Sequence, residues 1–216
     1  IKIFCSGRTD AGVHAFMQVL HFDTESIRSS TEWVRGVNSY LPADIRVIWS
    51  KEVDESFHAR FSAKQRSYIY NILNDKTPSA LWSGRSLFIP QKLDTRSMKL
   101  AAKYLIGEHD FSSFRGSGCQ SKTPVRNINN IKISRKKNFL LVEIQANAFL
   151  LHMVRIIIGT LLMVGKKEIK PKEVNTILLQ QDRRRAGKTV NSSGLYFLGP
   201  EYPKKFKLPD FRNNLI

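Results

Sequence analysis

The sequence predicts an α+β fold in which helices pack on one face of mixed or antiparallel sheets. Residues 139–146 alternate two sets of side chains, which is typical of a strand. Residues 29–41 and 94–106 repeat apolar side chains at helical spacing. Strands and helices are interspersed, but several predicted strands are close neighbours along the chain, which favours mixed or antiparallel pairing.

The first predicted elements are a strand, a helix and two more strands. Residues 16–22 are nearly all apolar and predict a buried strand. Ser29 and Glu32 have the spacing of a capping box, so we expect a helix to begin there, with an apolar face formed by Trp33, Val34, Val37 and Leu41. Residues 45–49 and 66–73 predict strands, and the loop between them could join two domains.

The later elements are mainly helical. The helix over 94–106 carries an apolar stripe, and Gly107 is expected to cap its C-terminus. An almost entirely apolar run predicts a second helix over 148–164. Pro171 predicts the start of a short third helix, because its missing N–H costs nothing at that position. Residues 195–198 predict the last strand.

The chain is strongly basic, with 35 Lys and Arg against 18 Asp and Glu and a formal net charge of +17. Such a charge attracts polyanions, of which nucleic acid is the commonest, although a merely soluble cationic protein is the alternative. Candidate phosphate contacts, each of which could instead be a plain surface charge, are Arg60, Arg66, Lys122, Arg126, Arg183, Arg184, Arg185 and Lys188.

Cysteine usage and hydropathy indicate the compartment. Cys5 and Cys119 form neither a metal-ligand spacing nor a disulfide framework, which suits a reducing, cytoplasmic environment. The apolar run 149–164 is too short to cross a membrane and contains Arg155, so we expect no membrane span. The first residue, Ile1, is not Met, and we therefore expect a further N-terminal segment whose targeting content is open.

Arg155 stands out because the helix around it is expected to be buried. A buried guanidinium keeps its proton and needs anionic or carbonyl partners. It could be a fixed cation that orients a catalytic carboxylate, a structural ion pair, or a side chain that reaches the helix surface. His152, one turn earlier, is interpreted as a hydrogen-bonded packing residue and not as a catalyst.

A short turn near the N-terminus presents Asp10. Residues 6–15 read SGRTDAGVHA, in which two glycines bracket the Arg-Thr-Asp-Ala segment before an apolar strand. Such a turn can hold a carboxylate at the start of a strand in a fixed direction. The alternative is an ordinary turn aspartate, since Asp is common in turns for local hydrogen-bonding reasons.

Six segments closely resemble the tRNA pseudouridine synthase A family, in that family's order. The resemblance covers nearly the whole chain, and the two blocks that contain Asp10 and Arg155 are highly specific. The segments are GRTDAGVHA (7–15), VNSYLPADIRV (37–47), FHARFSAKQRSYIY (57–70), GEHDFSSFR (107–115), NAFLLHMVRIIIG (147–159) and SGLYF (193–197).

The resemblance implies a role for five residues. Asp10 matches the family's essential carboxylate, and Arg155 matches the basic residue that pairs with it. Arg8 is similar to the residue that helps to hold the target nucleotide out of its stack. Tyr68 matches the tyrosine that packs against the target base, and Leu195 matches an apolar residue that lines the pocket.

The resemblance also implies an architecture and partners. Two ferredoxin-like α+β halves are expected to meet at a central basic cleft, with residues 1–60 forming the first half, 61–203 the second and 204–216 a polar, loosely held tail. The family isomerises uridines 38 to 40 of the tRNA anticodon stem-loop. It acts as a homodimer without cofactor or metal.

Two departures from the family pattern concern the ends of the chain. The family begins with a strand that carries Asp-Gly and Gly-Trp-Gln signatures, and nothing similar precedes Ile1 here. The family also has Ala-Pro before its final Gly-Leu, whereas Asn191, Ser192 and Ser193 stand there in this chain. The second departure puts the wall around Leu195 in doubt.

The chemistry explains why such residues are needed, and two rival functions remain. Pseudouridine formation requires an ionised carboxylate shielded from water, and a paired arginine opposes the rise in its pKa on burial. A non-catalytic tRNA-binding or tRNA-folding protein would have no use for Asp10 facing a polyanion. A nuclease or glycosidase would need a second carboxylate or a metal cluster, for which the sequence shows no spacing.

Overall fold

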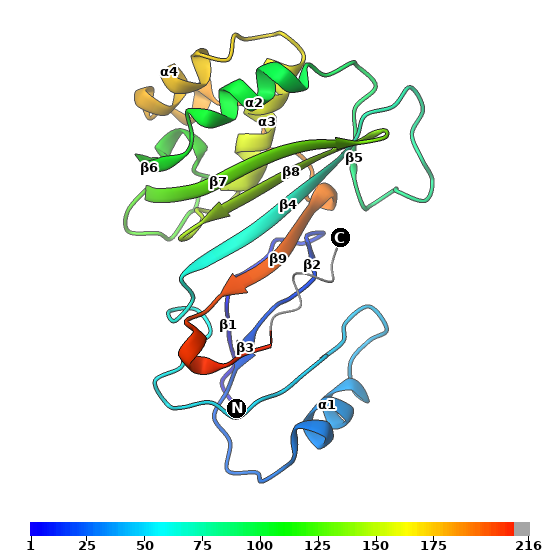
Figure 1. The fold of residues 1–216 in the computed structure, drawn as a ribbon, viewed down its shortest axis with the longest axis vertical. Helices are drawn as coiled ribbons and strands as arrows, with labels where there is room; N and C mark the ends of the chain where they lie inside the picture. Colours follow the sequence, from blue (N-terminus) through cyan, green and yellow to red (C-terminus); the bar gives the residue numbers. More distant parts are fainter. Residues whose placement is uncertain (210–216) are drawn as a thin grey trace.

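The computed structural model describes residues 1–209 and shows an α+β protein (Figure 1). Within these residues the larger sheet has seven strands in the order β2-β9-β4-β8-β7-β6, with β5 also paired to β4. β2 runs parallel to β9 and β5 parallel to β4, whereas the other pairs are antiparallel. The predicted class with mixed pairing is confirmed. The strands are β2 (His14–Ala15), β4 (Gln65–Leu73), β5 (Leu87–Phe88), β6 (Gly107–Asp110), β7 (Val125–Lys136), β8 (Phe139–Ala146) and β9 (Leu195–Glu201).

Three helices, α2 (Thr95–Lys103), α3 (Met153–Gly165) and α4 (Glu173–Gln180), lie on one face of this sheet (Figure 1). Almost every residue of α3 is buried, and Ile156 belongs to the same core cluster as Tyr70 of β4. Truncation of such a fully buried isoleucine to alanine costs about 2–5 kcal/mol. The packing therefore makes α3 a rigid support for the polar side chains at its beginning.

The N-terminal residues form a smaller part with its own strands and helix. β1 (Phe4–Cys5) and β3 (Leu20–His21) pair as a separate antiparallel ribbon. α1 (Ser30–Asn38) lies at the opposite end of the molecule from α2, α3 and α4 (Figure 1). Ser29 and Glu32 form the predicted capping box. Short 3₁₀ turns cover Ser112–Phe114, Arg183–Arg185, Ser192–Gly194 and Lys204–Phe206.

A second apolar cluster joins the N-terminal part to the segment after β9. Phe57 and Phe206 pack with ring centroids 5.0 Å apart, and Phe206 is 8% exposed. Lys51 Nζ donates hydrogen bonds to the carbonyls of Phe206 and Lys207 at 3.2 and 2.7 Å. The expectation of a loosely held segment is therefore wrong for residues 204–209, because an apolar side chain anchors it. Residues 210–216 lie outside the described part of the chain.

Several predicted elements differ in extent. The strand expected over 16–22 is only β3, and residues 45–49 form no strand. There the amide of Asn38 binds both the N–H and the carbonyl of Val47 at 2.8 Å, so a side chain takes the place of a partner strand. The helix expected from 148 begins at Met153 because His152 adopts a left-handed conformation, with φ of 59°.

β6 and β7 were not among the predicted strands, although β7 is the longest strand of the described residues. β7 pairs with β8 and carries many polar side chains, so its apolar alternation is weak. The helix expected over 94–106 is shorter, with Asp94 as its N-cap. Gly107 has the positive φ of a cap, 105°, but already belongs to β6. The division at residue 60 and the central cleft stay predictions.

Candidate active site

Asp10 and Arg155 form an ion pair between the N-terminal turn and the first turn of α3. Arg155 Nη1 donates a hydrogen bond to Asp10 Oδ2 at 2.8 Å. The side chain of Arg155 is 15% exposed and that of Asp10 is 32% exposed. The carboxylate is therefore paired with a guanidinium and is still reached in part by solvent.

The turn that carries Asp10 is closed by hydrogen bonds on both sides. The Ser6 N–H donates to the carbonyl of Val19 at 2.8 Å, and Gln18 Nε2 donates to the carbonyl of Gly7 at 2.6 Å. The Val13 N–H donates to the carbonyl of Asp10 itself at 3.1 Å. After the turn, β2 joins β9, so the carboxylate is held between the small ribbon and the large sheet.

Gly12 allows the turn to approach the segment before β9. Its φ of +80° lies in the left-handed region that favours glycine. A Cβ at this position would lie 2.7 Å from Ser192 Oγ, which is closer than real contacts permit. The serine that departs from the family's Ala-Pro pattern is therefore a direct neighbour of the Asp10 turn.

Arg155 is oriented by the backbone of residues 186–190. Its Nε donates to the carbonyl of Val190 at 2.8 Å, which leaves Nη1 directed at Asp10. This backbone can reach α3 because Gly159 has no side chain: a Cβ there would lie 2.0 Å from the Lys188 carbonyl oxygen. Thr160 Oγ1 accepts a hydrogen bond from the Gly187 N–H at 2.9 Å and secures the contact.

His152 is a second neighbour of Asp10. Its Nε2 lies 3.3 Å from Asp10 Oδ2, and its side chain is 33% exposed. The interpretation of His152 as a hydrogen-bonded packing residue and not a catalyst stays a prediction, but its place beside the carboxylate was not predicted. Its spacing of three residues from Arg155 was the available signal, because such residues share a helix face.

Tyr68 lies on β4 in an aromatic setting close to the Asp10 turn. Its ring contacts Phe149 edge-on and Phe197 at a tilt, with centroids 5.0 and 4.9 Å away. A Cβ on Gly7 would lie 3.9 Å from the Tyr68 hydroxyl. Burial raises the pKa of Tyr68 to about 12. The charge of Arg66 lowers this pKa, and the charge of Asp10 raises it by a smaller amount. The hydroxyl is therefore neutral at physiological pH.

Arg8 and Leu195 have opposite environments. Arg8 is exposed and makes no hydrogen bond or ion pair with residues 1–209, so its guanidinium is available to a ligand. Leu195 is 5% exposed and lies opposite Tyr70 in the β4–β9 ladder. Little of its surface is open to a substrate, because Leu195 belongs to the main core cluster.

Two of the candidate phosphate contacts are structural. Arg66 donates to the carbonyls of Ser6, Arg60, Ala63 and Asn147 and so joins three segments of the chain. Arg126 is 9% exposed and binds Ser121 and the carbonyls of Thr123 and Val125.

Arg184 pairs with Asp182 at 2.9 Å, and Arg183 binds Ala186 and Thr189. The exposed candidates are Arg60, Lys122, Arg184, Arg185 and Lys188.

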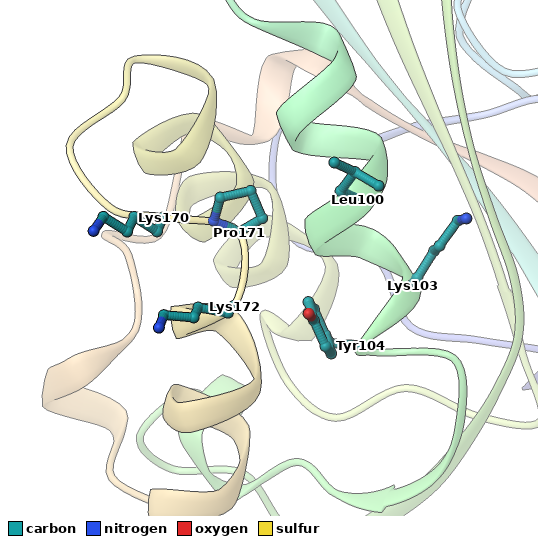
Figure 2. Close-up of a pocket in the computed structure, with 6 residues that line it drawn as sticks. All are labelled: Leu100, Lys103, Tyr104, Lys170, Pro171 and Lys172. Carbon is teal, nitrogen blue, oxygen red and sulfur yellow. The ribbon is translucent and has the colours of Figure 1, made fainter.

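A hollow of about 540 Å³ lies away from these residues, between α2 and the connection from α3 to α4 (Figure 2). Its walls are Leu100, Lys103, Tyr104, Lys170, Pro171 and Lys172. Lys103 points away from Lys170 and Lys172, so the ammonium groups do not converge on one anion (Figure 2).

In residues 1–209, no group of three or more His, Cys, Asp or Glu side chains could hold a metal ion. No helix of the described chain is long and apolar enough to span a membrane.

Comparisons with known proteins find close relatives. A family model described as tRNA pseudouridine synthase matches residues 1–62 and 101–203. The chain is 51% identical over 209 residues to tRNA pseudouridine synthase A of Coxiella burnetii, covering 97% of this chain and 80% of that protein. The protein of the same name from Hydrogenovibrio crunogenus is 49% identical with the same coverage. That of Buchnera aphidicola is 47% identical over 216 residues, covering 100% of this chain and 82% of the relative.

Proposed function

Because the chain belongs to the tRNA pseudouridine synthase family, we propose that Asp10 is the carboxylate with which it converts uridine in tRNA to pseudouridine. The activity as an isomerase acting on tRNA follows from the family and from relatives of about half-identical sequence. The role of Asp10 is supported by its place in the structure, and above all by the 2.8 Å ion pair with Arg155.

The reaction is redox-neutral and conserves all atoms. The bond between uracil N1 and ribose C1′ breaks, the base rotates, and a bond forms between C5 and C1′. C5 loses a proton and N1 gains one. An ionised carboxylate can attack either the sugar carbon or the base, and both routes require the same residue in the same charge state.

Arg155 pairs with this carboxylate and directs it. Removal of a carboxylate from water favours its protonated form, and a cation within hydrogen-bonding distance opposes that tendency. The second hydrogen bond from Arg155, to the Val190 carbonyl, restricts the guanidinium to one orientation. Arg155 is thus a positioning residue, and Asp10 is the group that touches the substrate.

Tyr68 and Arg8 serve the extruded nucleotide in this proposal. A uridine must leave its stack before it can enter the site, at a cost of a few kcal/mol. Stacking on an aromatic ring recovers about 1–3 kcal/mol, and the Tyr68 ring lies near the Asp10 turn. Arg8 is exposed two residues from Asp10 and can contact the RNA that the base has left. Leu195 supports the site indirectly, as part of the core cluster against which Tyr68 packs.

The anticodon stem-loop, with uridines 38 to 40, is the substrate region we infer from the resemblance. The exposed cations Arg60, Lys122, Arg185 and Lys188 would bind its phosphates. A cytoplasmic homodimer is part of the same proposal. Free Cys5 and Cys119 accord with a reducing compartment, and exposed apolar side chains such as Leu20, Ile27 and Tyr40 offer surface to a second copy.

Pseudouridine mapping by carbodiimide-stop sequencing tests the proposal. Transfer RNA treated with the protein should show new stops at positions 38 to 40, and treatment with the Asp10→Asn variant should show none. The rate is expected to fall by on the order of a thousandfold or more. The variant should bind tRNA as well as the parent protein, because asparagine keeps the size and removes a charge that repels phosphate. Isomerisation by Asp10→Asn at the parent rate would end the assignment.

A further inference from the structure

His152 approaches the same oxygen of Asp10 that Arg155 binds. Nε2 of His152 lies 3.3 Å from Asp10 Oδ2, and Arg155 Nη1 lies 2.8 Å from it. Two nitrogens therefore converge on Oδ2 from one turn of chain. No residue in the described range 1–209 donates a hydrogen bond to Oδ1. The two oxygens of the carboxylate are thus in different environments.

The backbone of His152 is held in a conformation that non-glycine residues seldom adopt. Its φ and ψ are 59° and 4°, in the left-handed region, at the residue before α3. Glycine would adopt these angles without steric cost, so the backbone itself does not require a side chain here. The imidazole makes no capping hydrogen bond to α3. Capping therefore does not account for it.

Gly116 packs closely against Leu151 and the His152 imidazole because it has no side chain. The Gly116 N–H donates to the Leu151 carbonyl at 2.8 Å. A Cβ on Gly116 would lie 2.9 Å from that oxygen and 3.0 Å from His152 Nδ1. On the other side of the loop, Cys119 Sγ accepts a hydrogen bond from the Leu151 N–H at 3.4 Å. The loop of residues 116–119 thus supports the turn that carries His152, whose Nε2 lies near Asp10.

We propose that His152 is a positioning residue, which donates from Nε2 to Asp10 Oδ2 when uridine is bound and, together with Arg155, leaves Oδ1 as the oxygen that faces the substrate. The two atoms lie 3.3 Å apart without hydrogen-bond geometry. Catalytic hydrogen bonds in ligand-free sites are often long or poorly aligned and tighten on binding. This inference rests on the proposed role of Asp10. It adds that the carboxylate is presented by two side chains and not by Arg155 alone.

Two substitutions separate positioning from a structural role. His152→Gly removes the imidazole and relieves the left-handed backbone, so it should preserve or raise the melting temperature. It should also lower the single-turnover rate at saturating tRNA by on the order of ten- to hundredfold, because a misplaced carboxylate attacks poorly. The Kd for tRNA should stay unchanged. His152→Gln keeps an N–H donor at similar reach and should restore most of the rate.

A matched control exists at another left-handed residue. Gln181, with φ of 53°, ends α4 and is exposed. Gln181→Gly relieves the same backbone conformation away from the site and should leave the single-turnover rate unchanged. If His152→Gly has the parent rate, or if His152→Gln is as slow as His152→Gly, the inference is overturned.

Asp10→Asn, measured in parallel, distinguishes a failure of the His152 role from a failure of the proposed function. An inactive Asp10→Asn beside a fully active His152→Gly rejects only the role of His152. An active Asp10→Asn rejects the proposed function on which that role depends. A fall in rate for His152→Gly, recovery in His152→Gln and an unchanged tRNA Kd together support the inference.

Discussion

The Arg155 guanidinium binds Asp10 Oδ2 and the Val190 carbonyl oxygen at the same distance, 2.8 Å. Asp10 and Arg155 are separated by 145 positions in the sequence, and the ion pair joins the N-terminal turn to the most buried helix. One side chain thus connects the Asp10 carboxylate to the backbone of the segment before β9. Changes at either end of this connection should affect the rate.

Arg155→Leu should lower both activity and stability. The substitution leaves Asp10 without its closest cation and Val190 without a donor. Since Asp10 is still 32% exposed, the loss of unfolding free energy should be about 1–3 kcal/mol, below the cost for a fully buried pair. Urea denaturation and single-turnover pseudouridine mapping measure the two effects. Arg155→Lys, which cannot hold both partners in one plane, should recover stability better than rate. Full activity of the leucine variant would contradict this role.

Tyr68→Ala should weaken the capture of the flipped uridine, whereas Tyr68→Phe should not. Phenylalanine keeps the stacking surface, and alanine removes about 1–3 kcal/mol of it. The measurement is the Kd for a tRNA anticodon stem-loop. A loop with cytidine in place of the target uridines serves as the control substrate. Equal affinities of the parent protein and both variants would argue against stacking.

The stability of the fold should fall at alkaline pH in a way that depends on Tyr68. An unfolded tyrosine loses its proton near pH 10, and folded Tyr68, with its pKa raised to about 12 by burial, keeps it longer. Its contribution is therefore complete below pH 10 and is lost as pH rises towards 12, by about 2–3 kcal/mol. Tyr68→Phe should show a flatter decline over this range in denaturant titrations. The same decline in both proteins would refute the prediction.

Arg66→Met should act on stability and not on the salt dependence of tRNA binding. Arg66 donates to four backbone carbonyls, and methionine leaves them without that donor. The unfolding free energy should fall by about 2–3 kcal/mol. Exposed Lys122→Met is the matched control and should leave unfolding unchanged. A decrease of about one in the slope of log Kd against log salt for Arg66→Met would instead indicate a phosphate contact.

Gly159→Ala should displace the segment that orients Arg155. The added Cβ would meet the Lys188 carbonyl at 2.0 Å, so α3 and this segment must separate, at a cost of about 1–3 kcal/mol or more. The rate should fall with stability. Gly36→Ala in α1, where a Cβ meets no atom within 4 Å, should stabilise by up to about 1 kcal/mol. Thermal unfolding of the two variants makes the comparison, and similar melting temperatures would count against the close approach.

Local patterns in the sequence predicted the elements whose signals are local. The capping box at Ser29 and the alternation in β8 depend on neighbouring residues, and both are present. The cation at Arg155 required a partner by electrostatics alone, and the structure provides Asp10. By contrast, residues 45–49 have a strand pattern without a partner strand, since Asn38 occupies the backbone of Val47.

The left-handed backbone at His152 was beyond local prediction. Its conformation depends on the distant loop at Gly116 and on the approach of Asp10. The same holds for Arg66 and Arg126, whose carbonyl partners are brought together only by folding. Charge counting places such arginines on the surface, and only tertiary structure shows that they bind backbone.

β2 consists of two residues paired in parallel with β9, the last strand of the described residues. This short ladder joins the segment that follows the Asp10 turn to the segment that follows Val190. On the proposed role of Asp10, a polypeptide emerging from the ribosome completes its active site only after residues 190–201 have been synthesised, because Val190 orients Arg155 and β9 pairs with β2.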